Sequence, residues 1–148
     1  TSKTPGRTQQ INFFDLGDNR RLVDLPGYGF ARVPQAMKEQ WQYHLGEYLR
    51  LRQSLQGLVL LMDCRHPLTR HDCEMLAWSA EADLPVHVLL TKADKLKPGG
   101  RARVLAEVGE QLVGWHPGAR IQLLSASKHL GVDEARQHLG AWLETPGD

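Results

Sequence analysis

Short apolar runs alternate along the chain with longer stretches in which apolar residues recur every three or four positions. The short runs predict strands at residues 11–16, 21–24, 58–63, 85–90 and 121–124. The longer stretches predict helices at residues 34–53 and 133–143, and two more that begin near Thr69 and Pro98. Strands that alternate with helices of this length are typical of an α/β fold with a mostly parallel sheet, and we expect a single domain.

Several of these elements carry finer signals. A short turn, Gly17 to Asn19, makes the first two strands an antiparallel hairpin, and a glycine-bearing loop is predicted at 28–33. The run at 58–63 is apolar throughout, which is typical of a strand covered on both faces. Thr69 and Asp72 resemble a capping box at a helix start. The predicted inward residues of the helices are Met37, Trp41, Leu45, Tyr48, Leu49, Cys73, Leu76, Ala77, Ala80, Val104, Leu105, Val108, Leu112, Ala135, Leu139, Trp142 and Leu143; we also assign Trp78 and Trp115 to packing.

The composition is that of an ordinary globular domain. The 148 residues carry a net charge of +1, so bulk charge favours neither a nucleic acid nor a membrane as partner. Two cysteines form no disulfide framework and fit a reducing cytosol. No apolar run approaches the ~20 residues that a membrane helix needs. We therefore expect a cytoplasmic, monomeric protein with no membrane partner.

The first chemical signal is Asp24-Leu25-Pro26-Gly27. An aspartate that closes a strand places its carboxylate at the carboxyl edge of the sheet, where open α/β folds bind ligands. A carboxylate repels phosphate but can hold Mg²⁺ through water, and the metal can hold phosphates. Gly27 leaves room for a backbone N–H to approach a terminal phosphate. Alone, the pattern could equally be a strand that enters a Pro-Gly turn.

Two further polar motifs follow buried strands: Thr91-Lys92-Ala93-Asp94 and Ser125-Ala126-Ser127-Lys128. One carboxylate can accept both guanine N1–H and N2–H₂, whereas adenine would leave it unpaired, so we assign base recognition to Asp94. Lys92 would lay its aliphatic stem along the base or ribose. Backbone N–H groups of Ser125, Ala126 and Ser127 would donate to guanine O6. Either motif alone could be a solvated loop, but the two together favour a guanine site.

These three motifs resemble the third, fourth and fifth signature motifs of translation-factor-class P-loop GTPases. Residues 2–14, the longer string 24–31 (Asp-Leu-Pro-Gly-Tyr-Gly-Phe-Ala) and 63–67 (Asp-Cys-Arg-His-Pro) narrow the resemblance to the EngB (YihA/YsxC) family of bacteria, over nearly the whole chain. The resemblance implies a three-layer P-loop fold and a Mg²⁺-dependent GTP/GDP switch that acts in assembly of the large ribosomal subunit. It also links such proteins to ribosomal RNA, cell division and septation.

The resemblance also implies roles for individual residues. Thr8, in the switch I context Gly6-Arg7-Thr8-Gln9-Gln10, would reach Mg²⁺ and the γ-phosphate. Asp24 would hold Mg²⁺ through water, and Gly27 would sense the γ-phosphate beside Leu25 and Pro26. Tyr28 stands where many GTPases have glutamine, which implies slow hydrolysis with the water positioned by another group, a monovalent cation or a partner. Alternatively, Tyr28 packs switch II; we assign no catalytic base.

The sequence departs from the family pattern in one large respect: the phosphate-binding motif Gly-x-x-x-x-Gly-Lys-[Ser/Thr] does not occur. We therefore expect the chain to be a G domain incomplete at its N-terminus, without its central first strand, and to bind nucleotide weakly or not at all. The alternatives are a chain that borrows a strand from a second copy, a degenerate interaction module that has lost nucleotide binding, and an autonomous NTPase.

Two weaker signals remain open. Cys64, His66, His71 and Cys73 could bind zinc, although their spacing matches no standard finger, and Asp63 is assigned a structural or switch-coupled role. The basic residues near the switch loops could form a solvated face or a contact with ribosomal RNA, which the resemblance supports. These basic residues are Lys3, Arg7, Arg20, Arg21 and Arg32, the last on switch II.

Overall fold

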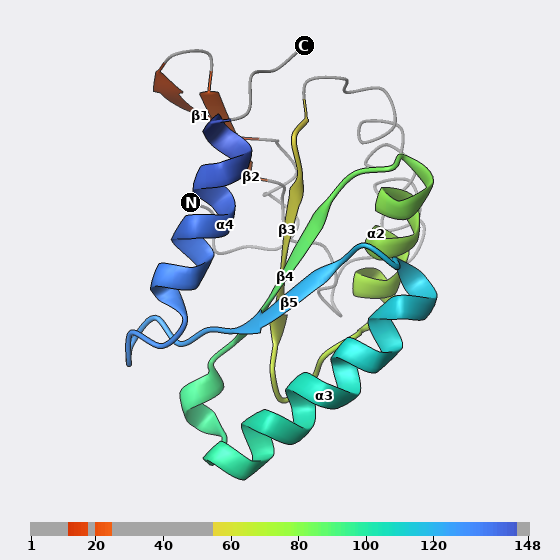
Figure 1. Ribbon diagram of the computed structural model, residues 1–148, viewed down its shortest axis with the longest axis vertical. Coiled ribbons are helices and arrows are strands. Elements are labelled where there is room, and N and C mark those ends of the chain that lie inside the picture. The colour runs from red at the N-terminus through yellow and green to blue at the C-terminus, as the bar shows by residue number, and fades with distance from the viewer. Residues whose placement is uncertain (1–11, 18–19, 25–54, 145–148) are drawn as a thin grey trace, which may run out of the picture. The chain divides into compact units, whose positions relative to one another are not determined.

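The computed structural model of the chain describes residues 12–17, 20–24 and 55–144 (Figure 1). The chain forms two compact units, Thr1–Glu47 and Tyr48–Asp148. The predicted loop at 28–33 and the predicted helix at 34–53, with its inward residues, lie outside the described residues.

The described part of the first unit is the predicted antiparallel hairpin. Strand β1 (Asn12–Gly17) pairs with β2 (Arg20–Asp24), and Asn12 lies opposite Asp24. Gly17 pairs with Arg20, so Gly17 is the last residue of the strand rather than the first of the turn. The register of the pairing shifts between Asp15 and Gly17. Asp24 ends β2, as predicted from the apolar run that it closes and the Pro-Gly pair that follows.

The second unit contains a parallel sheet of three strands in the order β3-β4-β5. Strand β3 (Leu58–Asp63) leads through helix α2 (Arg70–Glu81) to β4 (Val86–Thr91). A short 3₁₀ turn, η2 (Ala93–Lys95), and helix α3 (Pro98–Trp115) lead to β5 (Arg120–Leu123), and α4 (Val132–Glu144) follows. Figure 1 shows α2 and α3 on one side of this sheet and α4 on the other. The predicted α/β class is confirmed.

The central strand β4 is the most completely buried of the three strands in this sheet. Its residues from Val86 to Leu90 are all buried, as a strand between two neighbours and two helical layers should be. On the α4 side, the ring of His87 stacks on His138, with ring centroids 4.3 Å apart. The other buried apolar residues of the unit come mainly from the strands and from α2 and α3: Leu58, Met62, Met75, Leu76, Val108 and Leu112.

The prediction that β3 is covered on both faces is wrong at Leu61, whose side chain is 62% exposed. Leu61 pairs in register with Leu89, which lies beneath the α4 layer. Helix α4 reaches the start of β3, where a Cβ on Gly57 would lie 2.7 Å from the Trp142 ring. It does not cover Leu61, and β3 is an edge strand within the described sheet.

The capping box is confirmed, because the Thr69 hydroxyl accepts from the Asp72 N–H and the Asp72 carboxylate accepts from the Thr69 N–H. The predicted inward position of Ala77 is wrong: Ala77 is exposed, and Ser79 is buried. Burial of Ser79 is possible because its hydroxyl donates to the Met75 carbonyl. Trp115, assigned to packing, is 43% exposed because it ends α3 beyond the buried Leu112.

Candidate functional site

The carboxyl end of β4 continues into a backbone turn that its neighbours hold. The Cys64 N–H donates to the Thr91 carbonyl at 3.0 Å, and the Thr91 hydroxyl donates to the Met62 carbonyl at 3.3 Å. Lys92 then adopts a left-handed conformation, with φ 57°, which redirects the chain into η2. The buried thiol of Cys64 donates to the Lys92 carbonyl at 3.3 Å. Burial raises the pKa of this thiol, which keeps it protonated as a donor.

Asp94 lies in this turn and meets the loop that follows β5. The Ser125 hydroxyl donates to Asp94 Oδ1 at 2.7 Å, and the Ala93 N–H donates to the Leu124 carbonyl at 3.0 Å. The hydrogen bond from Ser125 is the main cause that lowers the pKa of the Asp94 carboxyl, so Asp94 is a carboxylate near neutral pH. The two motifs that sequence analysis placed at one sheet edge are therefore in direct contact.

The loop after β5 is a closed turn. Ser125 and Leu130 exchange two backbone hydrogen bonds, each of 2.9 Å, and the Lys128 N–H donates to the Ser125 hydroxyl at 3.2 Å. Gly131 follows with φ +74°, and a Cβ there would lie 2.2 Å from the Leu123 carbonyl oxygen, so this position requires glycine. The Ser125 N–H donates to the Leu130 carbonyl, so it is not available to donate to guanine O6. Of the three predicted O6 donors, this leaves the backbone N–H groups of Ala126 and Ser127, which are both exposed residues.

A second carboxylate, Asp63, ends β3 at the same edge. Arg65 donates to it three times: from its backbone N–H at 2.9 Å, from Nε at 3.0 Å and from Nη2 at 2.8 Å. Lys92 Nζ lies 3.8 Å from Asp63 Oδ2. The hydrogen bonds from Arg65 hold the pKa of the Asp63 carboxyl well below its usual range. Asp63 thus ties β3 to the turn after β4, in line with its predicted structural role.

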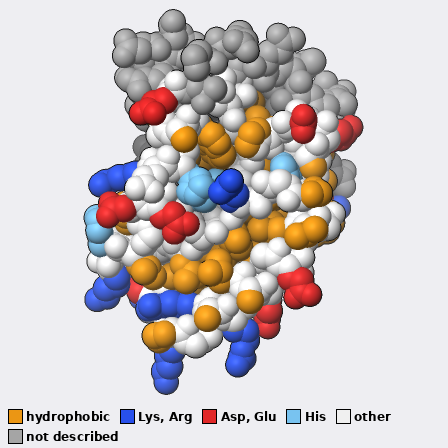
Figure 2. Space-filling model, in the orientation of Figure 1, with side chains coloured by type: hydrophobic (Ala, Val, Ile, Leu, Met, Phe, Trp, Pro, Cys, Tyr) orange, Lys and Arg blue, Asp and Glu red, His pale blue; other side chains and the backbone are white. Residues whose placement is uncertain are grey.

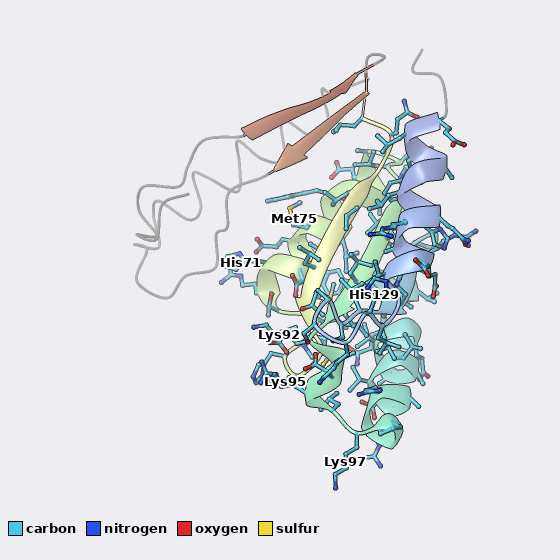
Figure 3. All side chains as sticks on the ribbon, turned by 90° about the vertical axis from the view of Figure 1, so that its left-hand side faces the viewer. His71, Met75, Lys92, Lys95, Lys97 and His129 are labelled. Carbon is cyan, nitrogen blue, oxygen red and sulfur yellow. The ribbon has the colours of Figure 1, made fainter. Side chains whose placement is uncertain are left out.

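Exposed basic side chains surround this edge. Lys92 is 61% exposed at its side chain, and Lys95, Lys97 and Lys128 are exposed as well. Figure 3 shows Lys92 and Lys95 extending from the turn after β4, with His129 of the loop after β5 at the same end of the sheet. In Figure 2, Lys and Arg side chains gather at the lower end of the molecule, the end at which α3 begins in Figure 1. An anionic ligand would therefore be attracted to this end.

Sequence analysis missed the residues that hold the site from behind. Arg101 Nε of α3 donates to the Ala93 carbonyl at 2.7 Å and to the Leu96 carbonyl at 2.9 Å. Gln122 Nε2 donates to the Gly131 carbonyl at 2.7 Å, while its Oε1 lies 2.7 Å from Nε2 of the buried His87. A polar residue within an apolar strand was the only available signal for Gln122. Arg101 gave none.

The remaining predicted site residues lie outside the described residues: Gly6, Arg7, Thr8, Gln9, Gln10, Leu25, Pro26, Gly27 and Tyr28. Asp24 is described only as the end of β2. In the described ranges no three His, Cys, Asp or Glu side chains are grouped to hold a metal, so the zinc alternative for Cys64, His66, His71 and Cys73 gains no support. No helix among the described residues is long and apolar enough to span a membrane.

Comparison with known proteins fixes the family. Residues 1–92 match the family model of the 50S ribosome-binding GTPase. A probable GTP-binding protein EngB from Shigella flexneri is 54% identical over 142 residues, which are 96% of this chain and 68% of that protein. The chain belongs to the EngB family of GTP-binding proteins.

Solved structures support the fold of this EngB-family chain. A crystal structure of a probable GTP-binding protein engB matches with a TM-score of 0.74 and 19% identity, over 95% of this chain and 83% of that one. The elongation factor SelB from Methanococcus maripaludis, in complex with the GTP analogue GPPNHP, matches with a TM-score of 0.65 and 20% identity over 95% of this chain and 29% of that one. The predicted P-loop GTPase fold and the predicted family are thus confirmed, and the GTPase family is one that hydrolyses GTP.

Proposed function

We propose that this chain carries the guanine-recognition half of an EngB-type switch, which binds GTP and GDP with Mg²⁺, hydrolyses GTP slowly and acts in assembly of the large ribosomal subunit. The observation that carries the proposal is the 2.7 Å hydrogen bond from the Ser125 hydroxyl to Asp94 Oδ1. It joins the two guanine motifs and orients one carboxylate at the ligand-binding edge of a parallel sheet.

The chemistry of base recognition follows from this arrangement. A carboxylate accepts hydrogen bonds only, so Asp94 is matched to the adjacent N1–H and N2–H₂ donors of guanine. Adenine presents a bare N1 and no amine at position 2, which would leave the carboxylate desolvated and unpaired. Ala126 and Ser127 would donate backbone N–H groups to O6, and the Lys92 stem would cover the base or ribose. Thr91 and Ala93 hold the turn through backbone contacts.

The phosphate half of the site rests on the family resemblance. Thr8 would supply an oxygen ligand and Asp24 would hold the ion through water, an arrangement that suits Mg²⁺, which usually keeps several waters and nucleotide phosphates as its other ligands. When bound, Mg²⁺ would neutralise phosphate charge. Gly6, Arg7, Gln9, Gln10, Leu25, Pro26 and Gly27 complete the proposed nucleotide contacts. Tyr28 has no amide with which to orient water, so we infer slow intrinsic hydrolysis, assisted by another group, a monovalent cation or a partner.

The proposed partner is the large ribosomal subunit, through ribosomal RNA. Two observations support it: the matched family is described as a 50S ribosome-binding GTPase, and exposed Lys95 and Lys97 flank the guanine motif. Such cations could contact RNA phosphates when the nucleotide is bound. The proposal places the protein in the cytoplasm as a monomer, with the link to cell division and septation carried by the family alone.

The test compares GDP and ADP binding, with Mg²⁺ present, on the polypeptide encoded by the complete gene and on the 148-residue chain. A GDP preference of at least about a hundredfold in the complete polypeptide is expected, since a polar site rejects the wrong base strongly. Equal affinity for ADP would contradict guanine recognition. Absence of binding by either polypeptide would favour the interaction module, and fast hydrolysis without a partner would favour the autonomous NTPase.

A further inference from the structure

We propose that Arg101 is a positioning residue for guanine recognition: it holds the two carbonyls on either side of Asp94, so that the carboxylate keeps the orientation in which guanine binds. This inference rests on the proposed function and extends it to a residue of α3 that is not part of any nucleotide-binding motif. Arg101 would not touch the nucleotide. It would act through the backbone of the η2 turn.

The contacts of Arg101 are specific. Its Nε–H is shared between the Ala93 carbonyl at 2.7 Å and the Leu96 carbonyl at 2.9 Å. Ala93 immediately precedes Asp94 and is fully buried. Its N–H donates to the Leu124 carbonyl at 3.0 Å, so Ala93 is held at the amide by the end of β5 and at the carbonyl by α3. Without Arg101, the Ala93 carbonyl would keep only the longer bond from the Leu96 N–H, at 3.1 Å.

Besides its contacts with Cys64, Leu124 and Ser125, the turn has few bonds of its own. Its own backbone bonds are Lys95 N–H to the Lys92 carbonyl at 2.9 Å and Leu96 N–H to the Ala93 carbonyl at 3.1 Å. Bonds of this 3₁₀ type have poorer geometry than those of an α-helix. Lys97, the residue before α3, makes no side-chain capping bond to the helix. A charged donor on two carbonyls is therefore a substantial part of what orders residues 93–96.

The place of Arg101 on its own helix argues in the same direction. Arg101 lies near the N-terminus of α3, where the positive end of the helix dipole disfavours a cation. Helix stability therefore does not explain an arginine at this position, whereas its contacts with the turn do. Recognition of a base edge needs the carboxylate within about 0.5 Å and 10–20° of the productive geometry, which is the precision that such a support provides.

The experiment measures affinities for GDP and ADP, with Mg²⁺, on the complete-gene polypeptide and its Arg101→Met variant. Arg103→Met is the matched control, because Arg103 is exposed on the same helix and makes no hydrogen bond or ion pair within the described residues. We expect Arg101→Met to weaken GDP binding about tenfold and to leave ADP binding unchanged, the loss typical of a charge-assisted hydrogen bond. Arg103→Met should stay within about twofold of wild type.

The Arg101→Lys variant is a second test, which asks how much GDP affinity the positive charge alone restores. A lysine keeps the charge but not the fixed donor geometry, so its GDP affinity should be intermediate, about threefold below wild type. A GDP-to-ADP ratio that is unchanged in both variants would overturn the proposal, as would an equal loss of GDP and ADP affinity, which indicates a general defect. If Arg101→Met does not fold, the ratio in Arg101→Lys decides: a reduced ratio supports the proposal and an unchanged one overturns it. A wild type without GDP preference would instead refute the proposed function.

Discussion

Asp63 at the end of β3 and Asp94 after β4 lie at the same edge of one parallel sheet, but their carboxylates have different partners. Asp63 accepts three hydrogen bonds from Arg65 and lies within 4 Å of Lys92, so protein cations neutralise it. Asp94 accepts one hydrogen bond from a neutral hydroxyl and, among the described residues, has no ion pair. A carboxylate that is oriented but not neutralised can still accept hydrogen bonds from a ligand.

A carboxylate can therefore lie at the ligand-binding edge of the sheet and still be unable to accept hydrogen bonds from a ligand, because the protein already occupies it. Both aspartates come at or just after the end of an apolar strand, and the motif around Asp94 had already favoured it as the base-recognition residue. The acceptor capacity of Asp63 is used within the fold, whereas Asp94 accepts one side-chain hydrogen bond from the described residues, at Oδ1. Function should therefore be sensitive to Asp94, and acid stability to Asp63.

The largest expected effect is on nucleotide binding. Asp94→Ala should weaken GDP binding by at least about a hundredfold, because the two guanine donors would lose their acceptor. Asp63→Ala, at the same edge, should change the GDP affinity less than about threefold. Calorimetric titration of both variants with GDP measures this difference. Equal losses in the two variants would remove the distinction between the two carboxylates.

A smaller effect is expected at the residue that orients Asp94. Ser125→Ala removes the hydroxyl that donates to Asp94 and accepts from the Lys128 N–H. GDP affinity should fall about tenfold, the usual cost of one buried hydrogen bond together with a polar group left unpaired. Ser79→Ala is the control, since it also removes a buried serine hydroxyl bond, to the Met75 carbonyl, in a helix outside the two motifs. An unchanged affinity in Ser125→Ala would show that Asp94 needs no such support.

The smallest effect concerns pH. The folded protein lowers the pKa of Asp63 below its ordinary 3.8, so the unfolded state binds the proton more tightly. The stability from this ion pair is therefore fully present above about pH 5 and declines as the pH falls through the folded-state pKa. Urea unfolding of wild type and Asp63→Ala should differ by a constant amount from pH 5 to 8 and by less below pH 4. A difference that grows on acidification would reverse the assigned sign.

Much of this arrangement was predictable from sequence. Alternating strands and helices gave the α/β class, and the polar residues after the apolar runs at 85–90 and 121–124 gave two motifs at one edge, because parallel strands end together. The capping box at Thr69 was also visible, since it depends on residues three apart. Each of these features depends on residues close together in the sequence. The parallel sheet then brings the two motifs to the same edge, so no long-range contact had to be predicted.

Other features depend on contacts between distant residues. Leu61 is exposed because α4 does not extend over it, and the apolar sequence of the strand does not indicate how much of the sheet a helix covers. The use of the Ser125 N–H within its own turn follows from the pairing with Leu130. The bond from Arg101 to Ala93 joins the start of α3 to a preceding turn, and no periodicity marks it. Sequence patterns predicted the candidate site, whereas its supporting contacts required the structure.

The most direct test of the role of Asp94 is the base preference of Asp94→Asn. An asparagine offers one acceptor and one donor, which match N1–H and the 2-carbonyl of xanthine but not the two donors of guanine. Wild type should prefer GDP over xanthosine diphosphate by at least about a hundredfold, and Asp94→Asn should prefer xanthosine diphosphate by at least about tenfold. A variant that still prefers GDP would contradict direct recognition of guanine by Asp94.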